Sequence, residues 1–323
     1  MKRNTLTRQL LICVLLVLAL FMSGCGSSSS DTIKIGIIMP ITGANASTTR
    51  DHINGMMIAI DDINNSGGLL GGKKIEVIQE DDRSTPSDGV SAVRKLITQD
   101  KVVAILGNFN SSVCAATRDV TNEYKIPQIV AGCSKDDLVT GYPFLFRANS
   151  NNTLQTEPFI RWFVKDQGKK RVAILFENTD WGRNLNDVVA KVVKENGGDV
   201  PIQESFNPGD TDFLPTLTKI KDVDPDLIIS PALVTEAAII ARQAKELDID
   251  RSLFAGWGGW AQTDIHKLSD GAEEGSMFVD FFPVTDPQTP VEEYLVEQIQ
   301  KRYPDTPPQY LSWTGLRCCS HLD

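Results

Sequence analysis

One continuous stretch near the N-terminus constrains the fold more than any other part of the chain. Residues 33–40 (IKIGIIMP) are apolar except for Lys34 and rich in β-branched side chains, which is typical of a buried strand. In residues 55–65 apolar side chains recur at helical spacing, and the glycine pairs within residues 66–72 favour the left-handed backbone that ends a helix. Residues 75–82 (IEVIQEDD) begin with a second β-branched run and end in acidic side chains. This order predicts a strand, a helix and a parallel strand, which is the repeating unit of an α/β sheet.

The same stretch resembles one protein family. The order Pro40-Ile41-Thr42-Gly43, a helix reading IAIDDINNSGGLLGGKKIEV and a strand ending in acidic residues is similar to the bacterial branched-chain amino-acid-binding proteins, the type I periplasmic solute-binding proteins of ABC transporters. The resemblance implies an α/β fold with two doubly wound parallel-sheet lobes joined by a multi-strand hinge. It also implies that hinge closure captures a small amino-acid-like or carboxylate ligand between the lobes, for delivery to an ABC-transporter permease. A ligand-sensing receptor component of the same fold is the alternative.

The N-terminal residues predict export and lipid anchoring. Basic side chains precede an apolar run over residues 10–22, which is too short to span a bilayer, since a spanning helix needs about 20 apolar residues. Residues 22–25 (MSGC) resemble a lipoprotein signal-peptidase box, so we interpret residues 1–25 as a lipoprotein signal peptide and Cys25 as the lipidation site. Residues 26–31 then form a flexible tether. The predicted location is extracytoplasmic, periplasmic or at the cell surface, with a lipid anchor in the membrane. An ordinary secretory peptide with an incidental cysteine is the alternative.

The remaining strand and helix patterns divide the chain into two lobes. We expect a discontinuous N-terminal lobe over residues 32–147 and 280–323, incomplete at its C-terminus, and a C-terminal lobe over residues 148–279. The chain has 323 residues, which suits two domains, and a formal net charge of −10. The signal peptide carries three basic residues and no acidic ones, so its removal makes the charge −13 (−10 − 3). An acidic chain without basic clusters argues against nucleic acid as a partner.

The loop at Asn110, Ser111 and Ser112 is the first candidate for ligand binding. It directly follows the strand predicted at residues 102–107 and opens a helix. Free backbone N–H groups at a helix N-terminus, together with a hydroxyl, form an anion site. The family resemblance places the carboxylate end of the ligand at this loop. The serines also suit a plain helix N-cap, and the two roles are compatible.

A second loop of the first lobe follows the strand predicted at residues 126–130. The resemblance implies ligand contacts from backbone groups and a hydroxyl here, and so from Cys133 and Ser134. Cys114 and Cys133 flank the same end of two sequential strands. In an oxidising compartment they can form a disulfide, and two reduced, packed cysteines are the alternative.

The candidates of the second lobe come from loops that follow predicted strands: Trp181, Thr235, Trp257 and Gly258. Tryptophan offers a wide apolar wall to a ligand, although a tryptophan can also simply pack the lobe. The resemblance implies an acidic partner for a ligand ammonium group at the position where this chain has Gly258. Three acidic residues on neighbouring loops can supply that carboxylate instead: Glu177, Asp180 and Glu236. We therefore expect a carboxylate ligand with an apolar or aromatic body, for which an ammonium group is not obligatory.

Enzyme, metal and nucleotide sites are not indicated. The three histidines, His52, His266 and His321, lack metal-ligand spacing to one another, and the chain has no Gly-x-Ser-x-Gly elbow. Residues 67–73 match the start of a phosphate-binding P-loop, but Lys74 stands where Ser or Thr is needed to hold magnesium. We therefore expect no enzyme activity, no metal and no cofactor. A hydrolase on an α/β scaffold is the third interpretation, because fold alone does not decide function.

The last eight residues depart from the family pattern. The resemblance holds through Thr314-Gly315 and is lost at Leu316, where the family continues with Tyr-Asp-Ala and an apolar helix. Residues 316–323 can be back-translated as TTA CGA TGC TGT AGT CAT CTT GAC, and without the first T the same bases read Tyr-Asp-Ala-Val-Val-Ile-Leu. We therefore predict a frameshift that deprives the first lobe of its last helices and third crossing, which exposes apolar area. Sequencing the gene tests this prediction: a gene without those codons, or without an open frame beyond the shift, refutes it.

Overall fold

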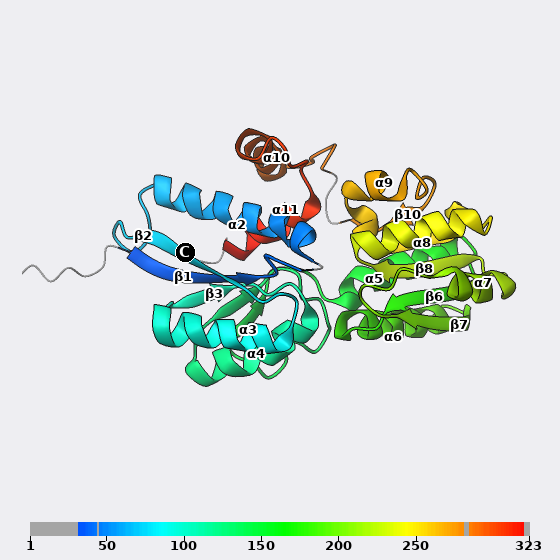
Figure 1. The fold of residues 1–323 in the computed structure, drawn as a ribbon, viewed down its shortest axis with the longest axis horizontal. Helices are drawn as coiled ribbons and strands as arrows, with labels where there is room; N and C mark the ends of the chain where they lie inside the picture. The colour runs from blue at the N-terminus through cyan, green and yellow to red at the C-terminus, as the bar shows by residue number, and fades with distance from the viewer. Residues whose placement is uncertain (1–31, 44, 281–283, 320–323) are drawn as a thin grey trace, which may run out of the picture.

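The computed structural model describes residues 32–43, 45–280 and 284–319, which form an elongated molecule of two α/β lobes (Figure 1). Each lobe contains a five-stranded sheet whose paired strands are parallel. The predicted fold class, two doubly wound parallel-sheet lobes, is confirmed. The predicted signal peptide, lipidation site Cys25, tether and last four residues lie outside the described residues.

The first lobe is built around strand β1, which pairs with β2 on one side and with β3 on the other. The sheet order is β2-β1-β3-β4-β5. Its strands are β1 (Thr32–Met39), β2 (Lys74–Asp81), β3 (Ala104–Leu106), β4 (Gln128–Val130) and β5 (Leu145–Arg147). Its helices over these strands are α2 (Ala46–Asn65), α3 (Pro86–Lys95) and α4 (Ser111–Tyr124). Ile35 and Ile37 pack against α2 on one face, whereas Ile38 packs against α3 on the other. A strand buried on both faces reads as a continuous apolar run, which explains the sequence of β1.

The second lobe repeats this arrangement with the sheet order β10-β9-β8-β6-β7. Its strands are β6 (Arg171–Glu177), β7 (Asp199–Phe206), β8 (Leu227–Ala232), β9 (Phe254–Gly258) and β10 (Met277–Phe278). Its helices are α5 (Asn152–Arg161), α6 (Asp180–Glu195), α7 (Leu214–Asp222), α8 (Val234–Glu246) and α9 (Asp264–Ser269). Val172 and Ile174 share a core with α5 and α6, and Ala173 and Leu175 share one with α7 and α8. Successive residues of β6 therefore serve opposite layers of helices.

An edge strand lies beside each predicted boundary between the lobes, at residues 147–148 and 279–280. Residues 145–147 form β5 at the edge of the first sheet, and residues 277–278 form β10 at the edge of the second. Each of these edge strands pairs with a single neighbour, so its formation depends on the sheet and not on a pattern of its own. Short helical turns follow or join several elements: η1 (Leu96–Asp100), η2 (Trp162–Asp166), η3 (Arg251–Leu253) and η4 (Gly259–Ala261).

The C-terminal helices return to the first lobe. These are α10 (Pro290–Arg302) and α11 (Tyr310–Cys319), and α11 packs along α2 (Figure 1). The Arg302 guanidinium donates to Asp61 and Asp62, each at 3.1 Å, which ties α10 to α2. Residues 316–319 are helical, and both Cys318 and Cys319 are buried in the first-lobe core. The structure does not test the frameshift, which stays a prediction.

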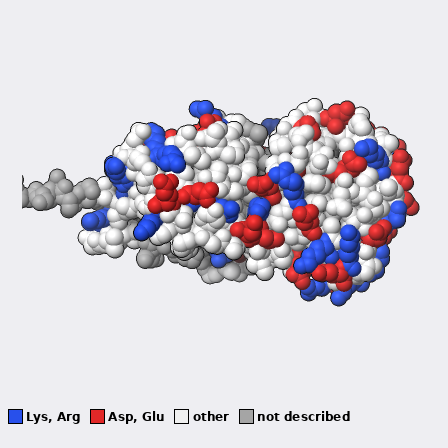
Figure 2. Space-filling model, turned by 90° about the horizontal axis from the view of Figure 1, so that it is seen from below, with Lys and Arg blue, Asp and Glu red and all other residues white. Residues whose placement is uncertain are grey.

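Charges of both signs are mixed over the molecular surface. Figure 2 shows acidic and basic side chains interspersed across both lobes, without a basic stripe on this face. Nucleic-acid binding proteins typically need such a stripe. Among the residues that the structure describes, none belongs to a helix with the length and hydropathy of a bilayer span.

Candidate ligand-binding site

A cleft between the lobes lies at the carboxyl ends of the strands. It contains about 790 Å³ of empty space, part of which is open to solvent, and residues of both lobes line it. Ligands of α/β proteins bind at the carboxyl ends of parallel strands, so this cleft is the candidate ligand-binding site. Seven of the nine predicted site residues line the cleft: Asn110, Ser111, Ser112, Ser134, Trp181, Trp257 and Gly258.

The N-terminus of α4 presents hydrogen-bond donors to this cleft. Its N-cap residue, Asn110, forms no side-chain cap, and its side-chain oxygen accepts from the Asn45 amide at 3.3 Å. Ser111 is 3% exposed, and its hydroxyl accepts from the backbone N–H of Lys135 at 3.4 Å. The first backbone N–H groups of a helix have no acceptor within the helix, and the helix dipole adds positive potential there. This helix start therefore suits a carboxylate.

A buried polar network supports the loop that leads into α4. The Asn108 amide donates to Asp82 at 2.9 Å, and its oxygen accepts from Thr117 at 2.8 Å and from Gln128 at 2.9 Å. All four side chains are fully buried. Burial raises the pKa of Asp82, and the hydrogen bond from Asn108 opposes that shift. Because buried polar groups need these partners, the network fixes the path of the chain into the candidate anion site.

Two tryptophans form the apolar wall of the second lobe. Trp257 is 3% exposed and packs edge-on against Phe159, with ring centroids 4.8 Å apart. Trp181 is half-buried and lies over Gly258, where an added Cβ would be 3.3 Å from the indole Cη2. Gly258 also has a φ of +68°, which disfavours any side chain at this position. The Trp181 ring therefore occupies the space that a side chain at residue 258 would need.

Two buried titratable side chains face the cleft. Glu177 is 3% exposed, and burial, with a smaller effect from Glu236, raises its pKa to about 7, whereas a hydrogen bond from Thr179 opposes the shift. Its Oε2 atom has no hydrogen-bond partner among the described residues. His52 is 1% exposed, and burial lowers its pKa to about 3, so the imidazole is neutral. Its ring packs edge-on against Phe109 at a centroid distance of 5.4 Å.

Two of the predicted contact residues, Cys133 and Thr235, do not line the cleft. Cys133 is fully buried beneath the loop and does not line the cleft, because its thiol points to the carbonyl oxygens of Asn108 and Phe109, each at 3.3 Å. Thr235 lies in the first turn of α8 with its side chain exposed, outside the cleft lining. The loop after β8 contributes Leu233 in its place.

Cys114 and Cys133 are neighbours in one buried cluster, as free thiols. Burial, with a hydrogen bond to Cys114, holds the pKa of the Cys133 thiol well above its usual value. The structure therefore corresponds to the reduced alternative, and the predicted disulfide is not formed in it. Oxidation of the pair remains a prediction for an oxidising compartment.

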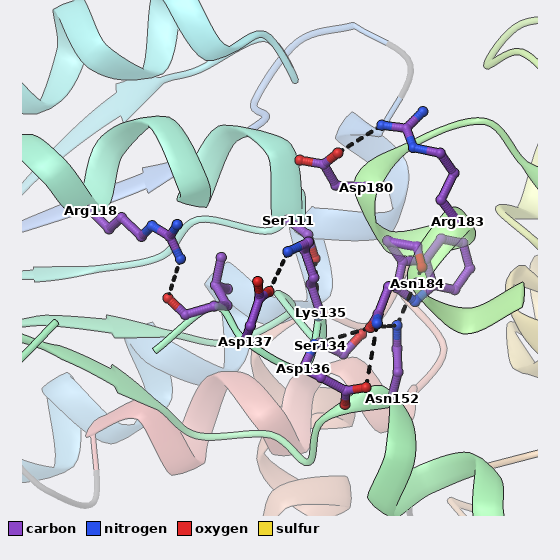
Figure 3. A network of polar contacts seen from close by, with 12 residues as sticks. Ser111, Arg118, Ser134, Lys135, Asp136, Asp137, Asn152, Asp180, Arg183 and Asn184 are labelled. Carbon is purple, nitrogen blue, oxygen red and sulfur yellow. Dashed lines mark hydrogen bonds and ion pairs between the residues drawn. The ribbon is translucent and has the colours of Figure 1, made fainter. Parts of the chain in front are cut away.

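The lobes are joined beside the cleft by a polar network (Figure 3). The Asn152 backbone N–H donates to the Ser134 carbonyl at 2.7 Å, and its side-chain amide donates to Asn184 at 2.9 Å. The backbone N–H of Asp136 in the first lobe also donates to the Asn184 side chain, at 3.0 Å. The Asp136 carboxylate in turn accepts from the backbone and hydroxyl of Thr153. This junction places Ser134 next to the crossing between the lobes.

The sequence did not predict several residues that line the cleft. His52 comes from the second turn of α2, and Leu311 and Thr314 come from α11. No local pattern marks these positions, because they lie within helices and not on loops that follow strands. Glu177, the last residue of β6, was named from the sequence only as a possible carboxylate, and Gln155 lies in α5. The other lining residues outside the predicted set lie on loops and crossings: Phe109, Ala131, Gly132, Asn149, Thr179, Leu233 and Val279.

A model of the periplasmic binding protein family matches residues 32–317. The chain belongs to this family. This periplasmic binding protein is 28% identical over 247 residues to the Leu/Ile/Val-binding protein BraC3 of Rhizobium johnstonii, covering 76% of this chain and 66% of that protein. It is 26% identical over 281 residues to the leucine-, isoleucine-, valine-, threonine- and alanine-binding protein of Pseudomonas aeruginosa, covering 86% of this chain and 74% of that one.

Among solved structures, the fold is similar to the branched-chain amino acid transporter substrate binding protein LivJ of Streptococcus pneumoniae in complex with isoleucine. The TM-score is 0.81 and the identity 26%, with 90% of this chain and 82% of that chain covered. The predicted membership among the type I periplasmic binding proteins of the branched-chain amino acid group is therefore confirmed.

Proposed function

We propose that this protein is the extracytoplasmic solute-binding lipoprotein of an ABC importer and captures a small carboxylate ligand, amino-acid-like or simple, between its lobes. The observation that carries the proposal is the N-terminus of α4, whose uncapped start and two serines line a cleft shared by both lobes. A helix N-terminus favours an anion, so the ligand carboxylate binds at Ser111 and Ser112. The tryptophan wall opposite packs on the body of the ligand.

The family relationship supports binding and release as the activity, with no catalytic step. Two relatives bear names of Leu/Ile/Val-type binding proteins, and the solved relative holds isoleucine. Delivery to an ABC-transporter permease then requires the cleft to open and close. The junction at Asn152 supports a hinge on one side of the cleft, and the contact of Thr48 with Gln262 across the lobes, at 3.4 Å, supports closure on the other.

Binding of small carboxylates is tested by isothermal titration of the full chain. The panel comprises leucine, phenylalanine, 4-methylpentanoate, 3-phenylpropanoate and benzoate. We expect saturable one-to-one binding of at least one member of this panel. The absence of binding to every member would overturn the proposal.

Lipid anchoring is tested separately, by mass spectrometry of the protein extracted from membranes. We expect the mature chain to begin at an acylated Cys25, because residues 22–25 match a lipoprotein processing site. Acyl chains stabilise membrane attachment by about 0.8 kcal/mol per buried methylene, so a multiply acylated chain should stay in the membrane fraction. An unmodified chain that begins at another residue would refute lipidation without affecting the ligand-binding proposal.

A further inference from the structure

We propose that Asp51 couples closure of the lobes to the uptake of a proton, so that the closed form holds its ligand more tightly in mildly acidic than in alkaline surroundings. This inference rests on the proposed function, because it concerns the opening and closing of the same cleft. Asp51 itself does not line the cleft. It acts on ligand binding through the contact between the lobes.

The first observation is the place of Asp51 where the two lobes meet. Asp51 lies in the second turn of α2, and the start of this helix is directed toward the second lobe (Figure 1). Thr48, three residues earlier on the same side of α2, contacts the Gln262 side chain of the second lobe at 3.4 Å. Asp264, in the first turn of α9, acts electrostatically on Asp51 from that same part of the second lobe. Separation of the lobes would therefore expose the Asp51 carboxyl group to water.

The second observation is that Asp51 is buried without a hydrogen-bond partner. Its side chain is 1% exposed, and neither carboxylate oxygen has a partner among the residues that the structure describes. The Arg50 guanidinium lies 4.0 Å from Oδ1, beyond hydrogen-bond distance, and is itself 48% exposed. A carboxylate in such surroundings is costly to ionise, so burial raises the pKa of Asp51 to about 7.

The charges next to Asp51 do not compensate for the lost water. The positive charge of Arg50 opposes the rise in the pKa of Asp51, whereas the negative charge of Asp264 adds to it. His52, the next residue on α2, is neutral, because burial lowers its pKa to about 3. The interface therefore favours the protonated, neutral form of Asp51.

The titratable groups of the two helices packed on α2 are paired, neutral or exposed. Arg302 of α10 binds Asp61 and Asp62, near the other end of α2. The two thiols at the end of α11 are neutral, because burial raises the pKa of each. Arg317 of α11 is exposed. A proton is therefore the means by which Asp51 is neutralised when the lobes close.

The direction of the pH effect follows from the closed and open forms. The pKa of Asp51 is about 7 when the lobes cover it, and its ordinary value, 3.8, applies when water reaches it. Below pH 3.8 the group is protonated in both forms, so closure takes up no proton. Between the two pKa values closure must take up a proton, and its equilibrium constant falls about tenfold per pH unit. Above pH 7 the group is ionised in both forms and the effect levels off. Ligand affinity should therefore fall by about tenfold between pH 6 and pH 8.

The test is isothermal titration at pH 6 and pH 8 of the wild-type chain and of Asp51→Asn, which stays neutral at both. The ligands are leucine, phenylalanine, 4-methylpentanoate, 3-phenylpropanoate and benzoate, whose carboxylates are ionised throughout this range. Glu177 also titrates near pH 7 and lines the cleft, so the readout is the difference between the two chains. We expect the loss of affinity from pH 6 to pH 8 to be about tenfold greater in the wild type than in Asp51→Asn.

A second readout detects the proton itself. Titrations at pH 6 in buffers of different ionisation enthalpy should show that the wild type takes up about one proton more per bound ligand than Asp51→Asn. The control Asp187→Asn changes an exposed acid of α6 that does not line the cleft, and it should behave as the wild type.

A variant of the second lobe separates this coupling from a purely structural role of Asp51. Asp264→Asn removes the negative charge that acts on Asp51 across the interface. It should tighten binding by roughly 2- to 5-fold at pH 8, where Asp51 is ionised, and change it little at pH 6. In the Asp51→Asn background the same substitution should have no effect at either pH, since the charge that it relieves is absent.

The outcomes distinguish this inference from the function on which it rests. A wild type whose pH dependence and proton uptake equal those of Asp51→Asn would overturn the role of Asp51 and leave ligand capture standing. If Asp51→Asn does not fold, as judged by circular dichroism, Asp264→Asn decides, and unchanged binding at pH 8 would overturn the coupling. Failure of every panel member to bind the wild type would overturn both proposals.

Discussion

Replacement of Ser111 and Ser112 together by alanine is expected to weaken binding of the panel ligands by about 100-fold or more. Both serines lie in the first turn of α4 and line the cleft. Each hydroxyl that donates to a charged carboxylate contributes about 1.5–3 kcal/mol, which is roughly 10- to 150-fold in Kd. Binding should not vanish, because the backbone N–H groups and dipole of α4 remain. The measurement is the Kd from isothermal titration at fixed pH.

Ser87→Ala is the matched control for this experiment. Ser87 lies in the first turn of α3, is exposed and does not line the cleft. It should leave the Kd unchanged. A Ser111→Ala/Ser112→Ala variant that binds as tightly as the wild type would place the carboxylate site elsewhere in the cleft.

Gly55→Ala is expected to destabilise the first lobe strongly, although it adds only one methyl group. A Cβ at residue 55 would lie 2.0 Å from the Ser312 carbonyl oxygen and 2.9 Å from the Leu316 backbone nitrogen. The fit is reciprocal, since a Cβ at Gly315 would lie 2.1 Å from the His52 carbonyl oxygen. Neither backbone can move without separating α2 from α11. We expect a loss of about 1–3 kcal/mol or more in the free energy of unfolding, measured with urea.

Gly89→Ala provides the comparison, because Gly89 also lies within a helix, α3. Its added Cβ would be 2.5 Å from Cγ1 of Val113, a side chain that can rotate or shift, in contrast to the backbone atoms opposite Gly55. The loss of stability should therefore be smaller than for Gly55→Ala. An unchanged free energy of unfolding in Gly55→Ala would contradict the close packing of α2 on α11.

The pattern of apolar residues was sufficient to predict the architecture. β1 and β6 carry the continuous apolar runs of strands buried on both faces, and glycine pairs mark the end of α2. The edge strands β5 and β10 were not predicted, because each is a short segment at a sheet edge that pairs with a single neighbour. Their formation depends on the sheet already present and not on their own sequence.

The candidate site was predictable where a loop follows a strand and opens a helix. Ser111 and Ser112 occupy such a position, and both line the cleft. Thr235 occupies a similar position, but α8 begins at Val234, one residue before Thr235, so the Thr235 side chain points to solvent. A shift of one residue on a helix start changes the direction of a side chain by about 100°. His52 lay beyond such reasoning, because it lies within α2 and not on a loop that follows a strand.

The central claim is tested most directly by a crystal structure of the complex between this chain and the tightest-binding ligand of the titration panel. The account predicts a single ligand between the lobes, with its carboxylate on the first backbone N–H groups of α4 and on the hydroxyls of Ser111 and Ser112. Its apolar body should contact Trp181 and Trp257. A ligand whose carboxylate lies on the second lobe, or a ligand bound outside the cleft, would contradict it.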